Sequence, residues 1–267
     1  MPKHIPVLLK QVIENLNIRD GKIYVDMTLG GAGHAYEILK RIPNGFLYGF
    51  DQDDYAIEKA EDKLGEYGNF QIIKDNFVNA KKRLNELGIN QVDGILFDLG
   101  VSSFQFDIGE RGFSYNQDNE LDMRMDLENN LTAKIIINTY DENDISTILF
   151  RYGEEKYARS IAKNIVKSRK VKPIETTFEL VEIIKKSLPF KELNKKGHPA
   201  KKTFQAIRIA VNDELNVLEE SLKNAIDLLA PNGRLAVITF HSLEDRIAKQ
   251  VFNRFSTIDI PPGVPII

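Results

Sequence analysis

Short apolar runs alternate with helix-like stretches along the first hundred residues. The runs that predict strands are 23–27, 45–51, 70–74 and 94–98. The stretches that predict helices are about 34–41, 53–64 and 78–87. Buried parallel strands are nearly continuous apolar runs, and a regular alternation of strand and helix is typical of a doubly wound sheet. We therefore expect an α/β fold with a parallel sheet.

The pattern changes between residues 107 and 202, where helical segments occur without a convincing strand. One segment, from Glu154 to Lys170, carries its apolar residues on one face. Another begins at Thr176, and Glu179 three residues later has the spacing of a helix capping box. We interpret 107–202 as an inserted helical subdomain, and 1–106 together with 203–267 as the main domain.

The sheet resumes after this insertion. Apolar residues recur at steps of three and four between Ile207 and Leu229, which predicts one long helix. A Pro-Asn-Gly turn ends it, and 234–240 predicts a fifth strand. His241 follows that strand, where it either contacts a substrate or lies at a helix start beside an N-cap Ser242.

Composition limits the classes of protein that need to be considered. The chain has 267 residues, of which 42% are hydrophobic, and it has no cysteine. It shows no long apolar segment and no signal-peptide pattern, so we expect a soluble cytoplasmic protein without a membrane partner. The absence of cysteine excludes disulfides and thiolate metal sites, and the four histidines lack zinc-ligand spacing. We expect no metal. The sequence leaves the oligomeric state open.

Charge is distributed unevenly along the chain. The net charge is −3, but residues 151–208 contain 16 Lys or Arg and 6 Asp or Glu, a balance of +10, which leaves −13 for the rest. A basic segment of this kind favours contact with the phosphates of a nucleic acid. The alternative is a lysine-rich helical surface that contacts only solvent.

A glycine-rich loop follows the first expected strand. Residues 23–34 read I-Y-V-D-M-T-L-G-G-A-G-H, and Asp51 ends the second strand about twenty residues later. Glycines let the backbone approach a ligand closely, and an acid at this distance is where a nucleotide-binding βαβ unit grips a ribose. The alternative for the loop is a purely structural turn. The alternative for Asp51 is a surface acid that caps the next helix, although Asp53 is better placed to be that N-cap. Asp26, just before the glycines, is placed to orient the loop or to meet a ligand ammonium.

The same loop departs from phosphate-binding patterns. Gly31 and Gly33 fit the first two positions of G-x-G-x-x-G, but Tyr36 stands at the third, and no P-loop Lys-Ser/Thr pair follows. The loop therefore suits a ligand with a ribose and an adenine but no phosphates, and S-adenosylmethionine fits that description.

A series of segments then gives the chain a family resemblance. In order they read H-I-P-V-L-L, T-L-G-G-A-G-H, D-L-G-V-S-S-F-Q, R-G-F-S-Y, L-D-M-R-M-D, Y-G-E-E-K-Y-A, H-P-A-K-K-T-F-Q-A-I-R-I-A-V-N and F-H-S-L-E-D-R. Together they resemble the bacterial 16S ribosomal RNA (cytosine-N4) methyltransferases, the RsmH/MraW family, over residues 4 to about 262. L-D-M-R-M-D and F-H-S-L-E-D-R are specific to that family, whereas many methyltransferases share the glycine loop.

The resemblance implies a fold, a cofactor and a substrate. The fold would be that of a class I (Rossmann-like) S-adenosylmethionine-dependent methyltransferase with an inserted helical subdomain for substrate recognition. The target would be a decoding-centre cytidine of 16S rRNA in the small ribosomal subunit, and the product S-adenosylhomocysteine. Ala32, Gly33 and His34 match the family's contacts to the methionine end, and Phe77 matches its adenine contact. The alternatives are an exposed helix-start residue for His34 and a core phenylalanine under the helix for Phe77. Many members read G-x-G-G-H in the loop, but alanine is small enough to keep the backbone contact.

Members usually continue past the Pro-Pro-Gly-x-Pro segment into a basic tail that carries the last strands of the sheet. This chain stops at Ile267. The resemblance therefore leaves the number of strands open.

Asp98 and Gln105 flank the place where the active site is expected, at the carboxyl end of the fourth strand. The exocyclic nitrogen of cytosine is a poor nucleophile that gains positive charge during methyl transfer, so a nearby carboxylate is useful. We take Asp98 as the catalytic candidate; the alternative is that it only binds the cofactor. The prolines and stacking aromatic of DNA amino-methyltransferases are missing after Asp98. An aromatic ring that stacks on the target base would therefore have to come from Phe104, Phe106, Phe113 or Tyr115.

Two other classes of protein share part of this pattern. A small-molecule methyltransferase shares the cofactor loop but does not need the basic insertion. A non-catalytic RNA-binding assembly factor needs the insertion but not the loop with Asp51.

Overall fold

The computed structural model describes residues 6–100 and 111–257. Gln105, Phe104 and Phe106 therefore lie outside the described residues. Contacts divide the chain into two units, residues 1–100 with 215–267 and residues 101–214. The sequence pattern had placed these boundaries at 106/107 and 202/203. That the second unit recognises a substrate stays a prediction.

The first unit is built on one parallel sheet. Its strands are β1 (Ile23–Asp26), β2 (Phe46–Asp51), β3 (Phe70–Lys74), β4 (Val92–Asp98) and β5 (Leu229–Ile238). Their order is β3-β2-β1-β4-β5, and every neighbouring pair runs parallel. The strand order therefore reverses next to β1, and in open α/β sheets ligands bind at such a switch point, beyond the carboxyl ends of the strands.

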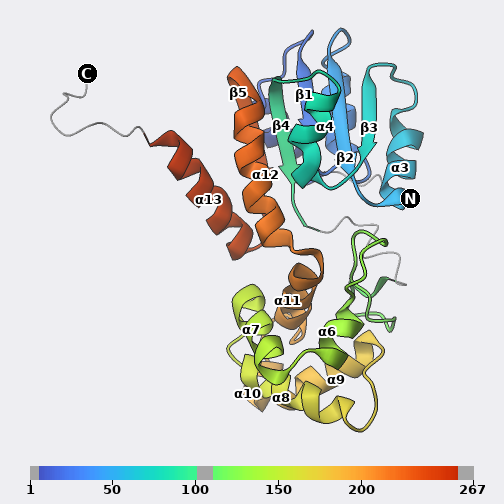
Figure 1. Ribbon diagram of the computed structural model, residues 1–267, viewed down its shortest axis with the longest axis vertical. Helices are drawn as coiled ribbons and strands as arrows, with labels where there is room; N and C mark the ends of the chain where they lie inside the picture. Colours follow the sequence, from blue (N-terminus) through green and yellow to red (C-terminus); the bar gives the residue numbers. More distant parts are fainter. Residues whose placement is uncertain (1–5, 101–110, 258–267) are drawn as a thin grey trace, which may run out of the picture. The chain divides into compact units, whose positions relative to one another are not determined.

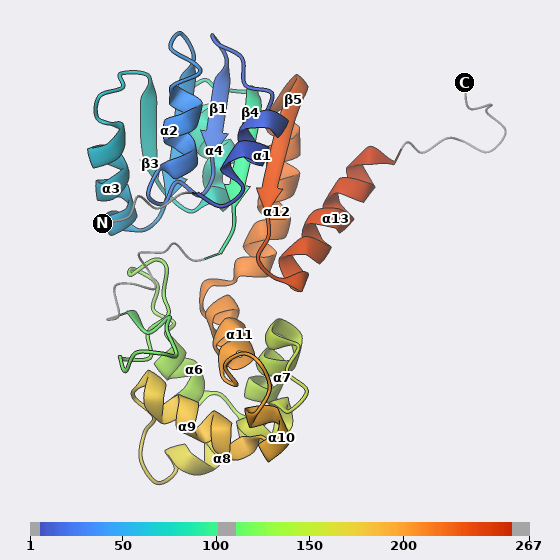
Figure 2. The same ribbon diagram turned by 180° about the vertical axis from the view of Figure 1, so that it is seen from behind.

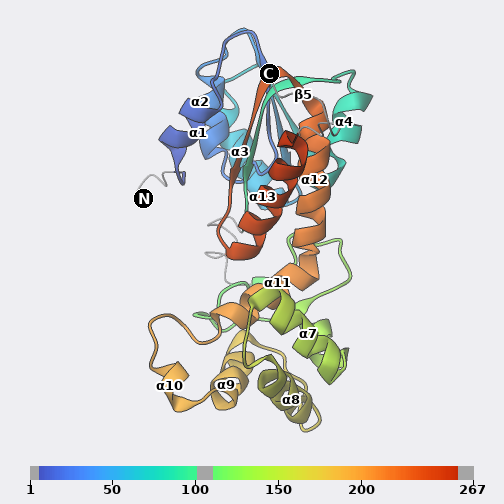
Figure 3. The same ribbon diagram turned by 90° about the vertical axis from the view of Figure 1, so that its left-hand side faces the viewer.

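Helices cover both faces of this sheet. They are α1 (Leu9–Asn15), α2 (Gly33–Leu39), α3 (Asp54–Leu64), the 3₁₀ turn η1 (Phe77–Asn79), α4 (Ala80–Glu86), α12 (Glu214–Leu228) and α13 (Ser242–Ser256). Apolar residues of α1, α2 and α3 pack in one cluster with strand residues such as Tyr24 and Leu96. Those of α4, α12 and α13 pack in another with Val25 and Phe97. The two layers are visible in Figures 1 and 2 from opposite sides and in Figure 3 nearly edge-on. The expected doubly wound α/β architecture is confirmed.

Two expectations about the last part of the chain were wrong, one about a helix and one about a strand. The single long helix is in fact two, α11 (Lys201–Asn212) and α12, because Asp213 adopts a left-handed conformation with φ 50°. Asp tolerates that conformation better than most residues, and the apolar spacing continues across the break. The fifth strand, β5, runs from Leu229 to Ile238 rather than from 234 to 240. The turn at 231–233 is a bulge within β5, opposite a register shift between Val92 and Gly94 of β4.

The second unit is helical. Its described helices are α6 (Ala133–Thr139), α7 (Glu142–Gly153), α8 (Ala158–Arg169), α9 (Thr177–Ser187), α10 (Phe190–Leu193) and α11. All of these except α10 contribute to one core, which includes Ile137, Leu149, Ile161 and Leu180. Within its described residues the extended pairing is a single bridge between Glu120 and Thr176. The Thr176–Glu179 capping box that the sequence predicted is present at the start of α9.

The L-D-M-R-M-D segment of this unit holds its own loop together. The Arg124 guanidinium donates to both carboxylate oxygens of Asp122 at 2.7 and 2.8 Å, and to the carbonyls of Leu127 and Asn129. The Asn212 side chain donates to the Met123 carbonyl, and Met123 has φ 64°. The Arg124 bonds thus hold the loop together, and the Asn212 bond ties the loop to the end of α11.

No helix among the described residues is long and apolar enough to cross a membrane.

Candidate functional site

Three carboxylates gather at one edge of the sheet. Asp26, Asp51 and Asp98 are the last residues of β1, β2 and β4, which are adjacent in the strand order β2-β1-β4. Since parallel strands end at the same edge, the sequence positions alone bring the three side chains to the switch point. The structure thus places two predicted site residues, Asp51 and Asp98, with Asp26 between them.

Asp51 is tied to the glycine loop. Its Oδ2 accepts a hydrogen bond from the Gly30 amide at 2.8 Å, and its Oδ1 accepts one from the Asp53 amide at 2.9 Å. An ionised carboxylate offers about four acceptor positions, so each oxygen keeps capacity for a ligand hydroxyl. Asp53 caps α3 through a bond from the Tyr55 amide, as the sequence suggested. Asp51 is therefore not needed as the cap, which had been the alternative for it.

Thr28 links the other two acids. Its amide donates to Asp26 Oδ1 at 3.1 Å, and its hydroxyl accepts from the Asp98 amide at 2.7 Å. Sequence reasoning missed this residue, although its place in D-M-T-L-G-G, two residues after a buried acid, is the local signal of such a turn. Thr28 fixes the ends of β1 and β4 relative to each other.

Burial dominates the electrostatics of this edge. It raises the pKa of Asp26 from 3.8 to about 7, and the neighbouring Asp98 and Asp51 carboxylates add to the shift. Burial also raises the pKa of Asp51 to about 6 and that of Asp98 to about 6. Three acids that resist ionisation together would be stabilised in their charged forms by a cation placed among them.

His34 joins the site from α2. It is buried, 4% exposed, so it is not the solvent-exposed helix-start residue that had been the alternative. Its Nε2 lies 3.0 Å from the Val7 carbonyl and its Nδ1 lies 3.5 Å from Asp98 Oδ2. Since the carbonyl only accepts, Nε2 carries a proton. The remaining ring nitrogen of the neutral side chain then faces Asp98, whose other oxygen, Oδ1, is buried with no hydrogen-bond partner among the described residues.

The loop between Asp26 and α2 is tightly packed. Ala32 is fully buried with φ 52°, and it is the residue before the first turn of α2. A Cβ on Gly33 would lie 2.3 Å from Cγ of Pro6, so only glycine fits where the N-terminal segment crosses the loop. Ala32, Gly33 and His34 therefore come together in one short turn, beside Asp98.

Phe77 lies in η1, after Asn76, whose side chain caps this turn by accepting from the Val78 amide. Its ring is partly buried and meets Phe97 edge to face, with the ring centroids 5.5 Å apart. The Phe77 ring thus contacts the core on one side and is still partly exposed to solvent. A cofactor contact at Phe77 stays a prediction, as does the absence of a metal.

His241 begins α13. Its side chain accepts from the Glu244 amide, and the Glu244 side chain accepts from the His241 amide, which makes a capping box. The N-cap is therefore His241 itself and not Ser242. A histidine is an unusual cap, which is why the sequence pointed to the serine.

Two aromatic residues proposed to stack on a substrate base are already engaged within the helical unit. Phe113 is 5% exposed, and the Arg111 guanidinium lies 5.8 Å from its ring centroid. Tyr115 stacks on His198 with centroids 4.4 Å apart and meets Phe204 edge to face. Phe113 is therefore closed to a base, and His198 already occupies one face of the Tyr115 ring.

Comparisons with known proteins agree on one family. The chain is 57% identical to Ribosomal RNA small subunit methyltransferase H of Finegoldia magna, over 99% of this chain and 86% of that protein. It is 56% identical to the protein of the same name from Exiguobacterium sibiricum, over 100% and 86%. A crystal structure described as a putative rRNA methylase from Clostridium thermocellum aligns with 44% of this chain and 69% of that one, at 21% identity and a TM-score of 0.32, which is too weak a likeness to bear on function. The model of the MraW methylase family matches residues 1–267. The chain therefore belongs to the MraW methylase family.

Proposed function

We propose that this methylase transfers a methyl group from S-adenosylmethionine to the exocyclic N4 of a cytidine in the decoding centre of the small-subunit (16S) rRNA. The relatives named above are small-subunit rRNA methyltransferases and align with almost all of this chain. The observation that carries the chemical part is the carboxylate of Asp98, which is half-buried at the switch point and keeps one oxygen without a partner among the described residues.

S-adenosylmethionine is the methyl donor of this family, and it supplies a methyl group bonded to a positively charged sulfur. The described residues fit such a ligand. The Asp51 oxygens have capacity for the two ribose hydroxyls, and the turn at Ala32, Gly33 and His34 offers backbone groups to the amino-acid end. Phe77 would contact the adenine, and Gln105, outside the described residues, completes the set expected from the sequence.

Asp98 would act on the attacking nitrogen. The lone pair of that amine is delocalised into the cytosine ring, and positive charge develops on it as the carbon–nitrogen bond forms. A carboxylate that accepts a hydrogen bond from the amine favours this change, and a partly dry site strengthens it. The alternative, in which Asp98 binds only the cofactor, makes different predictions for turnover.

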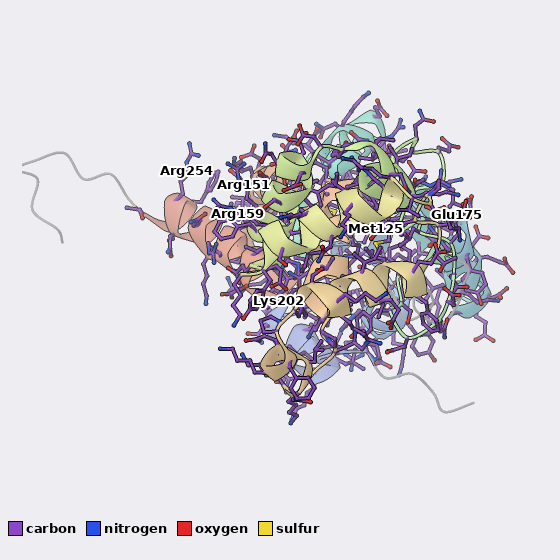
Figure 4. All side chains as sticks on the ribbon, turned by 90° about the horizontal axis from the view of Figure 1, so that it is seen from below. Met125, Arg151, Arg159, Glu175, Lys202 and Arg254 are labelled. Atoms are coloured by element: carbon purple, nitrogen blue, oxygen red, sulfur yellow. The ribbon has the colours of Figure 1, made fainter. Side chains whose placement is uncertain are left out.

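A basic stripe on α8 supports an RNA substrate. Arg159, Lys163, Lys167 and Lys170 are exposed at steps of three and four residues, from α8 to its C-cap. They therefore lie on one side of the helix along about 16 Å. None of them is within salt-bridge distance of an acid in the described part of the chain. Figure 4 shows Arg159 of α8 and Arg151 of α7 on the same side of the helical unit.

Other lysines of this unit are already paired with acids. Lys172 contacts Glu179 at 2.7 Å, and Lys185 contacts Glu182 at 2.9 Å. Lys186, Lys191, Lys196 and Lys201 are also exposed, with no acid within salt-bridge distance among the described residues, but they are spread over α9, α10, a loop and α11 rather than aligned on one helix. A set of unpaired cations in one row suits the phosphate backbone better than it suits a small uncharged substrate.

The test uses one preparation for both ligands and the reaction. The purified protein should bind S-adenosylmethionine in calorimetry, bind small-subunit RNA, and produce N4-methylcytidine in small subunits that lack the modification, as detected by nucleoside mass spectrometry. Cofactor binding without RNA binding would identify a small-molecule methyltransferase. RNA binding without cofactor binding would identify an assembly factor.

Asp98→Asn tests the catalytic assignment. The substitution keeps the shape and one acceptor oxygen but removes the charge that balances the developing positive charge. We expect kcat in single-turnover methylation to fall by roughly 10²–10³-fold, by analogy with the loss of an oxyanion-hole donor, with little change in cofactor affinity. An Asn variant that turns over normally when saturated with cofactor would make Asp98 a cofactor ligand only.

A further inference from the structure

Phe240 presents an exposed ring on a fixed backbone. The side chain is 55% exposed, although it comes only two residues after Ile238, the buried end of β5. Its amide donates to Glu244 Oε2 at 2.7 Å, and Glu244 is 3% exposed and part of the α13 capping box. A large apolar side chain in solvent is unfavourable, so a rigidly held exposed ring at this place calls for an explanation.

The strand register places this ring beside Asp98. Asp98 pairs with Ile238, and the Leu99 amide donates to the Ile238 carbonyl at 3.1 Å. Gly100 lies two residues beyond Asp98, and Phe240 lies two residues beyond Ile238, so both follow closely on the paired ends of β4 and β5.

A direct contact confirms this register. A Cβ on Gly100 would lie 3.4 Å from Cδ2 of Phe240, so the ring rests against the backbone two residues beyond Asp98. Gly100 has φ 98°, which only glycine adopts readily, and its lack of a side chain leaves the ring this position.

We propose that Phe240 provides the ring on which the target base stacks next to Asp98; this rests on the proposed function. A base that is methylated on its exocyclic amine has to leave its RNA stack, and it needs a flat apolar surface to replace its former neighbours. Stacking on Phe240 would hold the base plane so that the amine reaches Asp98. It would fill the role left open after Asp98, where the stacking aromatic of other amino-methyltransferases is missing.

The first test exploits the absence of tryptophan from the chain. A Phe240→Trp variant carries a single fluorophore at the proposed position. We expect its emission to be quenched when unmodified small subunits, or a cytidine-containing RNA strand, are added together with S-adenosylhomocysteine. The control is Phe255→Trp on α13, an exposed position in the same unit, where no quenching is expected. Equal responses of the two variants would overturn the proposal.

The second test measures methylation. Phe240→Leu keeps apolar bulk without a flat face, and Phe240→Tyr keeps the face. We expect kcat/KM for small subunits to fall roughly 5- to 100-fold in the Leu variant, the range for loss of one base–aromatic stack, and to be largely retained in the Tyr variant. Cofactor affinity should be unchanged in both.

The outcomes separate the two levels of inference. The role of Phe240 is overturned if the Leu variant has wild-type kcat/KM. It is also overturned if the Leu variant loses cofactor affinity and the Trp variant shows no quenching. A wild-type protein that binds the cofactor and methylates no small subunit overturns the proposed function instead, and quenching of the Phe240→Trp variant by the RNA strand then still decides whether this ring receives a base.

Discussion

At the scale of single residues, the site is a place where burial works against ionisation. Asp26, Asp51 and Asp98 each have a raised pKa because they are desolvated at the edge of the sheet. The Gly30 and Asp53 amides, which donate to Asp51, and the Thr28 amide, which donates to Asp26, only partly offset this effect for those two acids. A ligand with hydroxyl donors and a positive centre would relieve the penalty, so binding and protonation have to be coupled.

This coupling gives a pH dependence. The pKa of Asp51 is raised from 3.8 to about 6, so its contribution to the stability of the unliganded protein is present at low pH and is lost as pH rises through about 6. A ribose that hydrogen-bonds the ionised carboxylate lowers that pKa. Affinity for S-adenosylmethionine should therefore increase between about pH 5 and 6.5, a window that lies below the titration of an α-amino group.

Calorimetry in two buffers of different ionisation enthalpy checks this prediction by measuring protons released on binding at pH 6. Asp51→Asn should reduce the release, and Asp51→Ala should weaken binding by roughly 1.5–3 kcal/mol, the range for a hydrogen bond to a charged group. A pH-independent affinity together with an unaffected Ala variant would remove Asp51 from the site.

At the scale of elements, helix starts position the functional residues. Asp53 caps α3 next to Asp51, Ala32 leads into α2 next to His34, and His241 caps α13 next to Phe240. In each case the functional residue lies next to the N-cap of a helix, so the start of that helix fixes its backbone.

The cap at His241 makes a testable prediction about its role. His241→Ala removes the acceptor for the Glu244 amide and should destabilise the protein by about 1 kcal/mol, the usual cost of a lost cap. His241→Asn supplies another cap acceptor and should restore most of that stability, as measured by denaturant unfolding. If the Asn variant is stable but fails to methylate small subunits, His241 contacts the substrate, which is the other role that its position allows.

At the scale of the whole molecule, the predicted cofactor site and the predicted RNA-binding segment lie in different units. The sheet unit carries the three acids and the glycine loop, and the helical unit contains the basic segment 151–208 with its balance of +10. The −13 balance outside residues 151–208 means that electrostatic attraction for RNA has to come from the basic segment.

The α8 stripe should therefore control the salt dependence of RNA binding. Changing Lys163, Lys167 and Lys170 together to Gln should weaken RNA binding and reduce its salt slope by up to about 0.7–0.9 for each phosphate that is no longer neutralised. Cofactor affinity should stay the same.

A matched control removes the same charge elsewhere. Lys81, Lys223 and Lys249 pair with Asp227, Glu219 and Asp245 in the sheet unit, and changing these three lysines to Gln should leave the salt slope unchanged. Titrations at several salt concentrations compare the two triple variants. Equal slopes would mean that the α8 stripe is only a solvated surface.

The sequence by itself determined the parallel α/β sheet, the acid at the end of each site strand and the family, because these follow from local patterns. Buried strands are apolar runs, parallel strands end at one edge, and Asp26, Asp51 and Asp98 end three of them. The helix caps at Asp53 and Thr176 were likewise readable from short-range spacing. These features need no knowledge of distant contacts.

Only the tertiary structure decided the features that depend on residues far apart in the chain. The break at Asp213 was invisible because the apolar period runs through it. The link of Asp98 to Thr28, seventy residues away, and the clash that requires Gly33 beside Pro6 arise from packing between elements. The exposed ring of Phe240 beside Gly100 follows from the register of β4 with β5, and strand register is a property of the assembled sheet.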